Sequence, residues 1–207
     1  MRIVLASGNK GKISELDREL KKSFANTEIL GLDSFPEIGS IPETGDTFEK
    51  NALEKAQTVA GKTDLVSLAD DSGLEVDYLN GKPGVFSARF SGEGASDQEN
   101  NKKLLDLLKD LPFDKRTARF RCVLVACSPD GQHLVCEGSW EGKIALEPKG
   151  EMGFGYDPLF IDQESGLAAA EMQQAEKNKV SHRGKAIAEL LQRFEDFTKQ
   201  LPPEYKE

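Results

Sequence analysis

The stretch TARFRCVLVACSPDGQHLVCEGSW, residues 117–140, determines the class of the fold. Two runs rich in apolar, aromatic and β-branched residues flank the tetrapeptide Ser-Pro-Asp-Gly, residues 128–131. These four residue types are typical of a tight turn, so the stretch predicts a β-hairpin. Because hairpin strands are antiparallel, a sheet that contains this hairpin together with strand–helix–strand units must be mixed.

Strands and helices alternate upstream of the hairpin. Residues 3–5 predict a first strand, and Ile13, Leu16 and Leu20 mark one face of a helix that follows it. A second helix is predicted after IPETGD, residues 41–46, because Asp46 and Glu49 have capping-box spacing and Gly61 suits its end. The apolar side of that helix consists of Phe48, Ala52, Ala56 and Val59 or Ala60.

Two further strands and two further helices complete the expected elements. DLVSLA, residues 64–69, predicts a buried strand that ends at Asp70 and Asp71, and GLEVDYL, residues 73–79, predicts an alternating strand. A third helix is predicted from Ser96, with Glu99 in capping-box position. The last helix is predicted over about residues 181–201. Together these elements predict an α/β fold with a mixed sheet.

Length, composition and charge limit the classes of function. The 207 residues, 38% of them hydrophobic and 30% charged, predict one folded domain over residues 1–207. The formal net charge of −9 disfavours a nucleic-acid backbone or an anionic membrane as partner, although lysines or a divalent cation can still hold a small anionic ligand. No apolar run approaches the ~20 residues of a membrane-spanning helix, and MRIVLAS is too short for a signal-peptide core. We therefore expect a cytoplasmic protein.

The three cysteines give no sign of a metal or disulfide site. Cys122, Cys127 and Cys136 form no C-x-x-C pair and have no zinc-type spacing with His133 or His182. We expect small, buried and reduced side chains at all three positions.

A phosphate-binding loop is one interpretation of SGNKGK, residues 7–12. The loop lies between the first strand and the first helix, where backbone N–H groups, a helix N-terminus and lysines can hold phosphate. It is not a Walker A loop, because Ile13 follows Gly11-Lys12 where that motif has Ser or Thr. A simple polar turn is the alternative. Asn51 and Lys55, four apart on the second predicted helix, share one face and could assist, with a solvated lysine on a surface helix as the alternative.

The adjacent carboxylates of Asp70 and Asp71 indicate a nearby cation. If the loop holds a polyphosphate, Mg²⁺ would use one or two protein carboxylates together with phosphate oxygens and water. Asp71 is a natural ligand, and Glu43, in the loop before the second helix, is a plausible second ligand. Asp70 would point to the other face of the strand. An acidic turn without a ligand is the alternative.

Two later motifs have features of a site for a nucleotide base. In MGFGYDPLF, residues 152–160, Phe154 or Tyr156 could stack on a base, and Asp157 is either a turn former or an acceptor for a ring N–H. In SHRG, residues 181–184, Ser181 suits a helix N-cap. His182 and Arg183 could donate hydrogen bonds to an acceptor on the ligand, because a basic pair is otherwise unfavourable at a helix N-terminus.

The motif blocks resemble a known family. SGNKGK, ETGDTFEKNALEKA, LADDSGLEVDYLNGKPGVFSARFSG, GFGYDPLF and SHRGKA are similar to blocks of the inosine triphosphate pyrophosphatase family, in the same order along essentially the whole chain. The resemblance implies an elongated α/β fold, a mixed twisted sheet flanked by helices, with two lobes and a central nucleotide cleft. It also implies a Mg²⁺-dependent homodimer that hydrolyses ITP, dITP and XTP to the monophosphate and pyrophosphate.

The same resemblance assigns roles to individual residues. Asp71 is implied to be the catalytic proton acceptor and, with Glu43, a metal ligand. The implied substrate-binding residues are Ser7, Gly8, Asn9, Lys10, Gly11, Lys12, Lys55, Ser72, Phe154, Gly155, Tyr156, Asp157, Lys177, His182 and Arg183.

Three other readings compete with this one. A Maf-like pyrophosphatase would act on pyrimidine or modified nucleotides, but the SHRG and GFGYDP blocks argue against it. A nucleotide-binding regulatory module would not require both Glu43 and Asp71. A structural or nucleic-acid-binding protein is disfavoured by the acidic charge balance.

Overall fold

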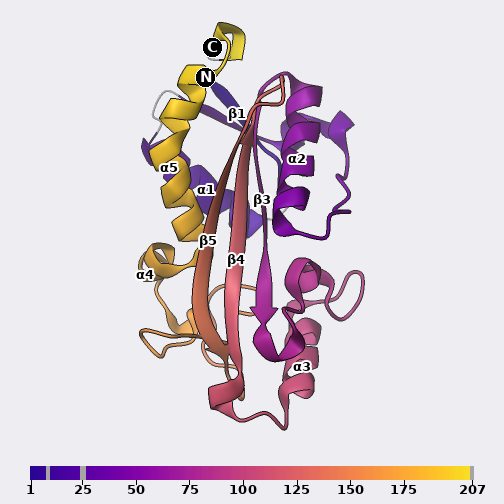
Figure 1. Ribbon diagram of the computed structural model, residues 1–207, viewed down its shortest axis with the longest axis vertical. Helices are drawn as coiled ribbons and strands as arrows, with labels where there is room; N and C mark the ends of the chain where they lie inside the picture. The colour runs from indigo at the N-terminus through magenta and orange to yellow at the C-terminus, as the bar shows by residue number, and fades with distance from the viewer. Residues whose placement is uncertain (8–9, 24–26, 206–207) are drawn as a thin grey trace. The chain divides into compact units, whose positions relative to one another are not determined.

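The fold is built on one six-stranded sheet with the strand order β2-β1-β3-β4-β5-β6. Figure 1 labels β1, β3, β4 and β5 of this sheet. The structure is a computed structural model that describes residues 1–7, 10–23 and 27–205. The strands are β1 (Arg2–Leu5), β2 (Glu28–Gly31), β3 (Val66–Val76), β4 (Thr117–Cys127), β5 (His133–Ile144) and β6 (Phe160–Asp162). β1 pairs in parallel with β2 and β3, whereas β5 and β6 are antiparallel. The predicted α/β class with a mixed sheet is therefore confirmed.

Helices connect and follow these strands. The α-helices are α1 (Lys10–Ser23), α2 (Phe48–Thr63), α3 (Asp97–Leu108), α4 (Gln174–Val180) and α5 (His182–Gln200). Short 3-10 turns are formed by Leu32–Ser34, Pro36–Ile38, Asp77–Leu79, Gly84–Arg89, Phe113–Lys115, Ala169–Glu171 and Pro203–Tyr205. No helix in the described part of the chain has both the length and the apolar character that crossing a membrane requires.

The predicted hairpin is confirmed as β4 and β5. Its turn is closed by two backbone hydrogen bonds of 2.9 Å, from Ser128 N–H to Gln132 O and from Gly131 N–H to Ser128 O. Gly131 has φ +88°, the left-handed backbone that favours glycine. The sequence Ser-Pro-Asp-Gly thus supplies the turn geometry that makes the sheet mixed.

The prediction of two separate strands around the acidic pair is wrong. β3 continues through Asp70, Asp71 and Ser72 without a break. Both carboxylate residues are buried, at 4% and 5% exposure. β1 pairs with β3 over residues 66–68, before the acidic pair, and the Asp71 carboxylate accepts a hydrogen bond from Asn51 of α2. A buried strand can hold charged residues when their polar atoms have partners.

The ends of α2 differ slightly from the prediction. The N-cap is Thr47, whose hydroxyl accepts a hydrogen bond from Lys50 N–H, while Asp46 instead pairs with the Lys50 ammonium at 2.6 Å. The helix ends at Thr63, with Asp64 as its C-cap at φ 57°, and not at Gly61. The predicted apolar side of α2 is buried as expected.

The predicted starts of α3 and α5 are confirmed. Ser96 and Glu99 form both hydrogen bonds of a capping box. The Ser181 hydroxyl accepts the Gly184 N–H at 3.1 Å, as an N-cap side chain does.

Contacts divide the chain into two compact units. Unit 1 consists of Met1–Asp71, Val123–Glu137 and Ala186–Glu207, and unit 2 consists of Ser72–Cys122 and Gly138–Lys185. β3, β4 and β5 each contribute residues to both units. A single domain over residues 1–207 stays a prediction. The three cysteines are buried, as expected.

The core of unit 2 is aromatic. Phe120 packs on Phe160 with ring centroids 4.6 Å apart, and Phe160 packs on Trp140 at 4.9 Å. Around these rings lie Leu74, Val76, Leu104, Leu108, Ala118, Ile144, Tyr156, Leu159, Ala169 and Met172. Residues of both β4 and α3 belong to this core, so the core holds these two elements in place.

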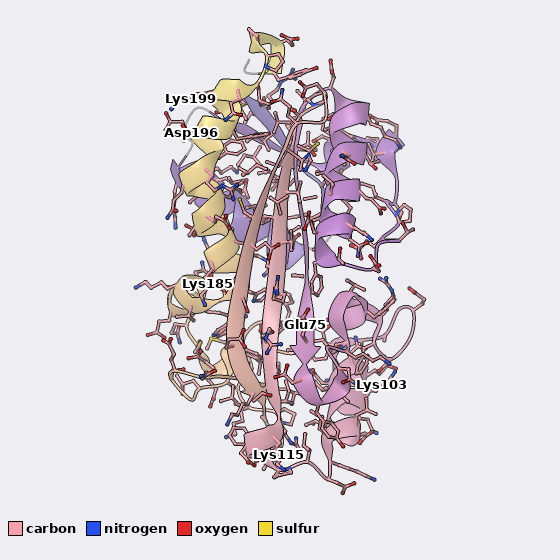
Figure 2. All side chains as sticks on the ribbon, viewed as in Figure 1. Glu75, Lys103, Lys115, Lys185, Asp196 and Lys199 are labelled. Carbon is pink, nitrogen blue, oxygen red and sulfur yellow. The ribbon has the colours of Figure 1, made fainter. Side chains whose placement is uncertain are left out.

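A surface ion-pair group covers part of the sheet in unit 2. Arg119 on β4 pairs with Asp77 at 2.9 Å, with Glu141 at 3.1 Å and with Glu75 at 4.0 Å. Figure 2 labels Glu75 on β3. The Thr117 hydroxyl also donates to Asp77, and this hydrogen bond, followed by Arg119, lowers the pKa of that carboxyl.

Candidate functional site

Glu43 and Asp71, which we call the acidic group, lie in unit 1, and their carboxylates accept hydrogen bonds from two side chains of α2. Asn51 Nδ2 donates a hydrogen bond of 2.9 Å to Asp71 Oδ2. Lys55 Nζ donates to Glu43 Oε1 at 2.6 Å and to the backbone carbonyl of Asp70 at 2.7 Å. Asn51 is fully buried and Lys55 is 9% exposed. The structure thus brings the predicted Glu43, Lys55 and Asp71 together.

The spacing of α2 explains why these side chains face the sheet. Asn51 and Lys55 are four residues apart and therefore lie on one side of the helix. Ala52 and Ala56, the next residue in each case, are fully buried. Small side chains let the helix approach β3 closely, so that a short amide can reach a carboxylate on the strand.

The loop before α2 fixes the orientation of the Asn51 amide. Gly45 N–H donates to Asn51 Oδ1 at 2.7 Å, so the Nδ2 end is directed at Asp71. A Cβ on Gly45 would lie 2.8 Å from Asn51 Oδ1 and 2.7 Å from Lys50 Cβ, which explains the glycine. The amide therefore holds one oxygen of Asp71 in a defined place.

The donor set fits a hard divalent cation that is completed by a ligand. Among the described residues, no group of three or more His, Cys, Asp or Glu side chains could hold a metal ion. Mg²⁺ does not require such a cage, because it is usually bound through one or two carboxylates, water and substrate phosphates. Glu43 and Asp71 provide two carboxylates around the same pair of α2 side chains.

The predicted phosphate loop is described only in part. Ser7 follows β1 and is half-buried, and Ala6 N–H donates to Leu68 O of β3 at 2.7 Å. Leu68 precedes Asp70 by two residues, so the loop starts close to the acidic pair. Gly8 and Asn9 lie outside the described residues, and α1 begins at Lys10. Binding of phosphate by Ser7, Gly8, Asn9, Lys10, Gly11 and Lys12 stays a prediction.

A second group, in unit 2, is centred on Asp157. Lys177 Nζ donates to Asp157 Oδ2 at 2.5 Å, and Phe154 N–H donates to the same oxygen at 2.9 Å. Asp157 and Lys177 are 4% and 8% exposed. A Cβ on Gly153 would lie 2.1 Å from Asp157 Oδ2, so this turn requires glycine there. Asp157 was predicted to be either a turn former or an acceptor for a ring N–H, and the structure shows it as a turn former.

Phe154 is the most exposed aromatic side chain of this motif. Its side chain is 38% exposed, and the Lys177 ammonium and the Arg183 guanidinium each lie 5.7 Å from its ring centroid. Tyr156 is 5% exposed, belongs to the core of unit 2 and donates its hydroxyl to Ser87 O at 2.8 Å. Burial raises the pKa of Tyr156, so the phenol stays neutral.

Arg183 and His182 lie at the start of α5 in different surroundings. Arg183 is 6% exposed and donates to Ser72 Oγ at 3.3 Å, which joins two predicted substrate-binding residues. The His182 ring stacks on Phe120 with centroids 4.7 Å apart and lies near Trp140 at 6.5 Å. His182 therefore contributes to the aromatic core, and its predicted hydrogen bond to a ligand stays a prediction.

Sequence reasoning missed two residues that contact the predicted base motif. Gly155 N–H donates to Asp97 Oδ2 at 2.7 Å, and Asn101 Nδ2 donates to Gly155 O at 3.0 Å. Both side chains come from α3, more than fifty residues earlier in the chain. Their spacing of four residues was visible in the sequence, but nothing local pointed to Gly155.

Comparisons with known proteins agree on one family. A family model described as the Ham1 family matches residues 3–193. A curated dITP/XTP pyrophosphatase of Nitratidesulfovibrio vulgaris is 54% identical over 201 residues, which are 94% of this chain and 96% of that protein. The solved structure of a HAM1 protein from Coxiella burnetii superposes with a TM-score of 0.87 at 40% identity, covering 95% of this chain and 99% of the other.

A third comparison has the activity in its title. The crystal structure titled as a nucleoside-triphosphatase and dITP/XTP pyrophosphatase from Mycobacterium abscessus superposes with a TM-score of 0.77 at 46% identity. It covers 92% of this chain and 97% of the other chain.

Proposed function

Because this chain belongs to the Ham1 family, we propose that it hydrolyses the non-standard purine nucleoside triphosphates dITP, ITP and XTP to the monophosphate and pyrophosphate. The resemblance read from the motif blocks is thereby confirmed at the level of the family. The observation that carries the proposal is the arrangement of Asp71, Glu43 and Lys55, because cleavage of a phosphoanhydride needs a proton acceptor, a metal site and a cation together.

The acidic group accounts for the attack on the α-phosphorus. Mg²⁺, when bound by Glu43 and Asp71, would neutralise phosphate charge and activate water. Asp71, held by Asn51, accepts the proton of the attacking water. Lys55 and Lys12 stabilise the negative charge of the departing pyrophosphate. Ser7 to Lys12 hold the phosphates of the substrate by loop N–H groups and side chains.

The group around Asp157 accounts for the choice of base. Phe154 provides the face for stacking, and Lys177, His182 and Arg183 provide donors. Inosine and xanthine present a 6-oxo acceptor, whereas adenine presents a 6-amino donor. An adenine base would leave buried donors unpaired, a penalty that can reach ~10⁴-fold in kcat/KM. A donor or a tight wall near C2 excludes the 2-amino group of guanine.

Pyrophosphate release tests the reaction. We expect release from dITP with Mg²⁺ and none with EDTA. A nucleotide-binding regulatory module would release none in either case. We also expect kcat/KM for ITP and XTP to exceed the values for GTP and ATP, and equal values would contradict the proposed base recognition. A preference for pyrimidine triphosphates would favour the Maf-like alternative.

The proposal also covers the binding partners, the cellular location and the oligomeric state of the enzyme. The substrate is a small molecule, and the net charge of −9 argues against nucleic acid or an anionic membrane as partner. We propose that the enzyme acts in the cytoplasm, and on the strength of the resemblance we propose that it is a homodimer. Light scattering coupled to size-exclusion chromatography measures the oligomeric state directly, and a monomer mass would contradict the homodimer.

A further inference from the structure

Helix α3 holds Gly155 by both of its backbone polar groups. The N–H donates to Asp97 Oδ2 at 2.7 Å, and the carbonyl accepts from Asn101 Nδ2 at 3.0 Å. Asp97 and Asn101 are four residues apart, so they project from the same side of the helix. One rigid element therefore sets the position of a single loop residue.

These hydrogen bonds fix the backbone on both sides of Phe154. The peptide before Phe154 is held by its own N–H, which donates to Asp157 Oδ2 at 2.9 Å. The peptide after it is held by Gly155 N–H, which donates to Asp97. With both flanking peptide planes fixed, φ and ψ of Phe154 are fixed, and so is the direction of its Cα–Cβ bond. Gly155 itself has φ +63°, which suits glycine.

Helix α3 is well anchored and can act as a fixed support. The Ser96–Glu99 capping box defines its first turn. Leu104 and Leu108 are fully buried in the aromatic core of unit 2. At the other end, the Arg116 guanidinium donates to Leu108 O at 2.6 Å. The core of unit 2 therefore holds α3 in place, and α3 in turn holds the loop around Gly155.

The amide oxygen of Asn101, unpaired among the described residues, is unfavourable for a purely structural role. Its Oδ1 is buried and accepts no hydrogen bond within the described part of the chain. An unsatisfied buried acceptor lowers stability, and an apolar side chain would avoid that loss. Its amide hydrogen bond instead goes to a loop that presents a ring with 38% exposure. Residues that reduce stability locally are expected at functional sites.

We propose that Asp97 and Asn101 are positioning residues for base recognition. Through Gly155 they hold the Phe154 ring in the orientation that accepts a purine base. This inference rests on the proposed function, in which Phe154 is the stacking face. Their loss would weaken binding of the base and leave the chemistry at Asp71 largely intact.

Four variants test the inference. Asp97→Ala and Asn101→Ala each remove one hydrogen bond to Gly155, and we expect the KM for dITP to rise by about tenfold while kcat stays within about twofold. The same variants should raise the Kd for the product dIMP by about the same factor, a readout that does not depend on hydrolysis. Asp97→Asn keeps an acceptor oxygen for Gly155 N–H, so it should restore KM to near the wild-type value. Lys102→Ala is the matched control, because it removes an exposed ion pair of α3, with Asp106 at 2.6 Å, without touching Gly155, and should leave KM and the Kd for dIMP unchanged.

A fifth variant separates this inference from the proposed function. Phe154→Leu removes the stacking face and should raise both KM and the Kd for dIMP by tenfold or more, about the value of one stacked base. If Phe154→Leu leaves both values unchanged, the assigned role of the ring is wrong. If it raises them while Asp97→Ala and Asn101→Ala do not, or if Lys102→Ala raises them equally, the positioning role is overturned. If Asp97→Ala does not fold, Asn101→Ala decides alone.

Discussion

Asn51 donates a hydrogen bond of 2.9 Å to Asp71, and this contact joins the buried side of α2 to the middle of β3. The amide is itself oriented by Gly45 N–H, which donates to its oxygen at 2.7 Å. A proton acceptor works only in a narrow range of positions relative to the water that it deprotonates. In the proposed mechanism, a helix residue that need not touch the substrate therefore positions the proton acceptor.

The first prediction concerns Asp71. In Asp71→Asn the side chain keeps its size but loses both its negative charge and its ability to accept a proton, so kcat should fall by about 10³-fold or more. The melting temperature should change by only a few degrees, because an amide can still pair with Asn51. Pyrophosphate release and thermal unfolding measure the two effects. Glu75→Gln, on the same strand but in the Arg119 group, is the control, and an Asp71→Asn enzyme with a tenth of normal turnover would contradict the role.

The second prediction concerns Asn51 itself. Asn51→Ala removes the hydrogen bond that orients Asp71, so kcat should fall by about 10- to 100-fold, less than in Asp71→Asn. Asn51→Asp should be worse than Asn51→Ala, because a second buried carboxylate would face Asp71. Single-turnover rates with saturating dITP measure the chemical step. If Asn51→Ala changes KM alone, the amide binds substrate and does not position Asp71.

The class of the fold could be predicted because its signals are local. Ser-Pro-Asp-Gly makes the turn between β4 and β5, and Ser96 with Glu99 caps α3, each within five residues of sequence. Such contacts require only the side chains and backbone of one short segment, so the residue types alone indicate them.

The continuity of β3 and the support of Gly155 could not be predicted in the same way. The Asp70–Asp71 pair interrupts the apolar pattern, and the amide that satisfies Asp71 comes from a helix twenty residues away. Asp97 and Asn101 reach a glycine 58 and 54 residues along the chain. Because contacts of this range exist only after folding, a pattern within one segment contains no information about them.

The third prediction concerns Arg116, which is 2% exposed and donates hydrogen bonds to three carbonyls. The acceptors are Leu108 O at 2.6 Å, Leu111 O at 2.9 Å and Ala145 O at 2.9 Å. Arg116→Met removes all three hydrogen bonds, although Leu108 O still accepts the Leu111 N–H, and should lower the free energy of unfolding by about 3 kcal/mol. Denaturant unfolding measures this loss.

Arg119→Met is the matched control for Arg116. Arg119 lies on β4, three residues after Arg116, but its ion pairs are on the surface and its side chain is 31% exposed. Loss of such pairs should lower stability by less than about 1 kcal/mol. Equal losses in the two variants would show that the carbonyl contacts of Arg116 contribute little.

The fourth prediction concerns the pH dependence of stability and rests on Asp162, which is 4% exposed. Burial alone would raise the pKa of this carboxyl, but hydrogen bonds from the Ser165 N–H, the Ser165 hydroxyl and the Trp140 indole, each 2.7 Å long, outweigh burial and lower the pKa. In the unfolded chain the carboxyl titrates near its ordinary value of about 3.9. Because the folded pKa lies below the unfolded one, the contribution of Asp162 to stability is fully present above about pH 4 and is lost as the pH falls through the folded pKa.

Asp162→Asn isolates this contribution. The variant should be less stable than the wild type by about 2 kcal/mol near neutral pH, because an amide presents donors to Ser165 where a carboxylate accepts. That gap should narrow steadily below about pH 4, since protonation removes the advantage of the wild-type carboxylate. Trp140 is the single tryptophan of the chain and contacts Asp162 directly, so its fluorescence follows the unfolding in denaturant. A gap that stays constant from neutral to acidic pH would mean that hydrogen bonds to the ionised form do not set the stability at this position.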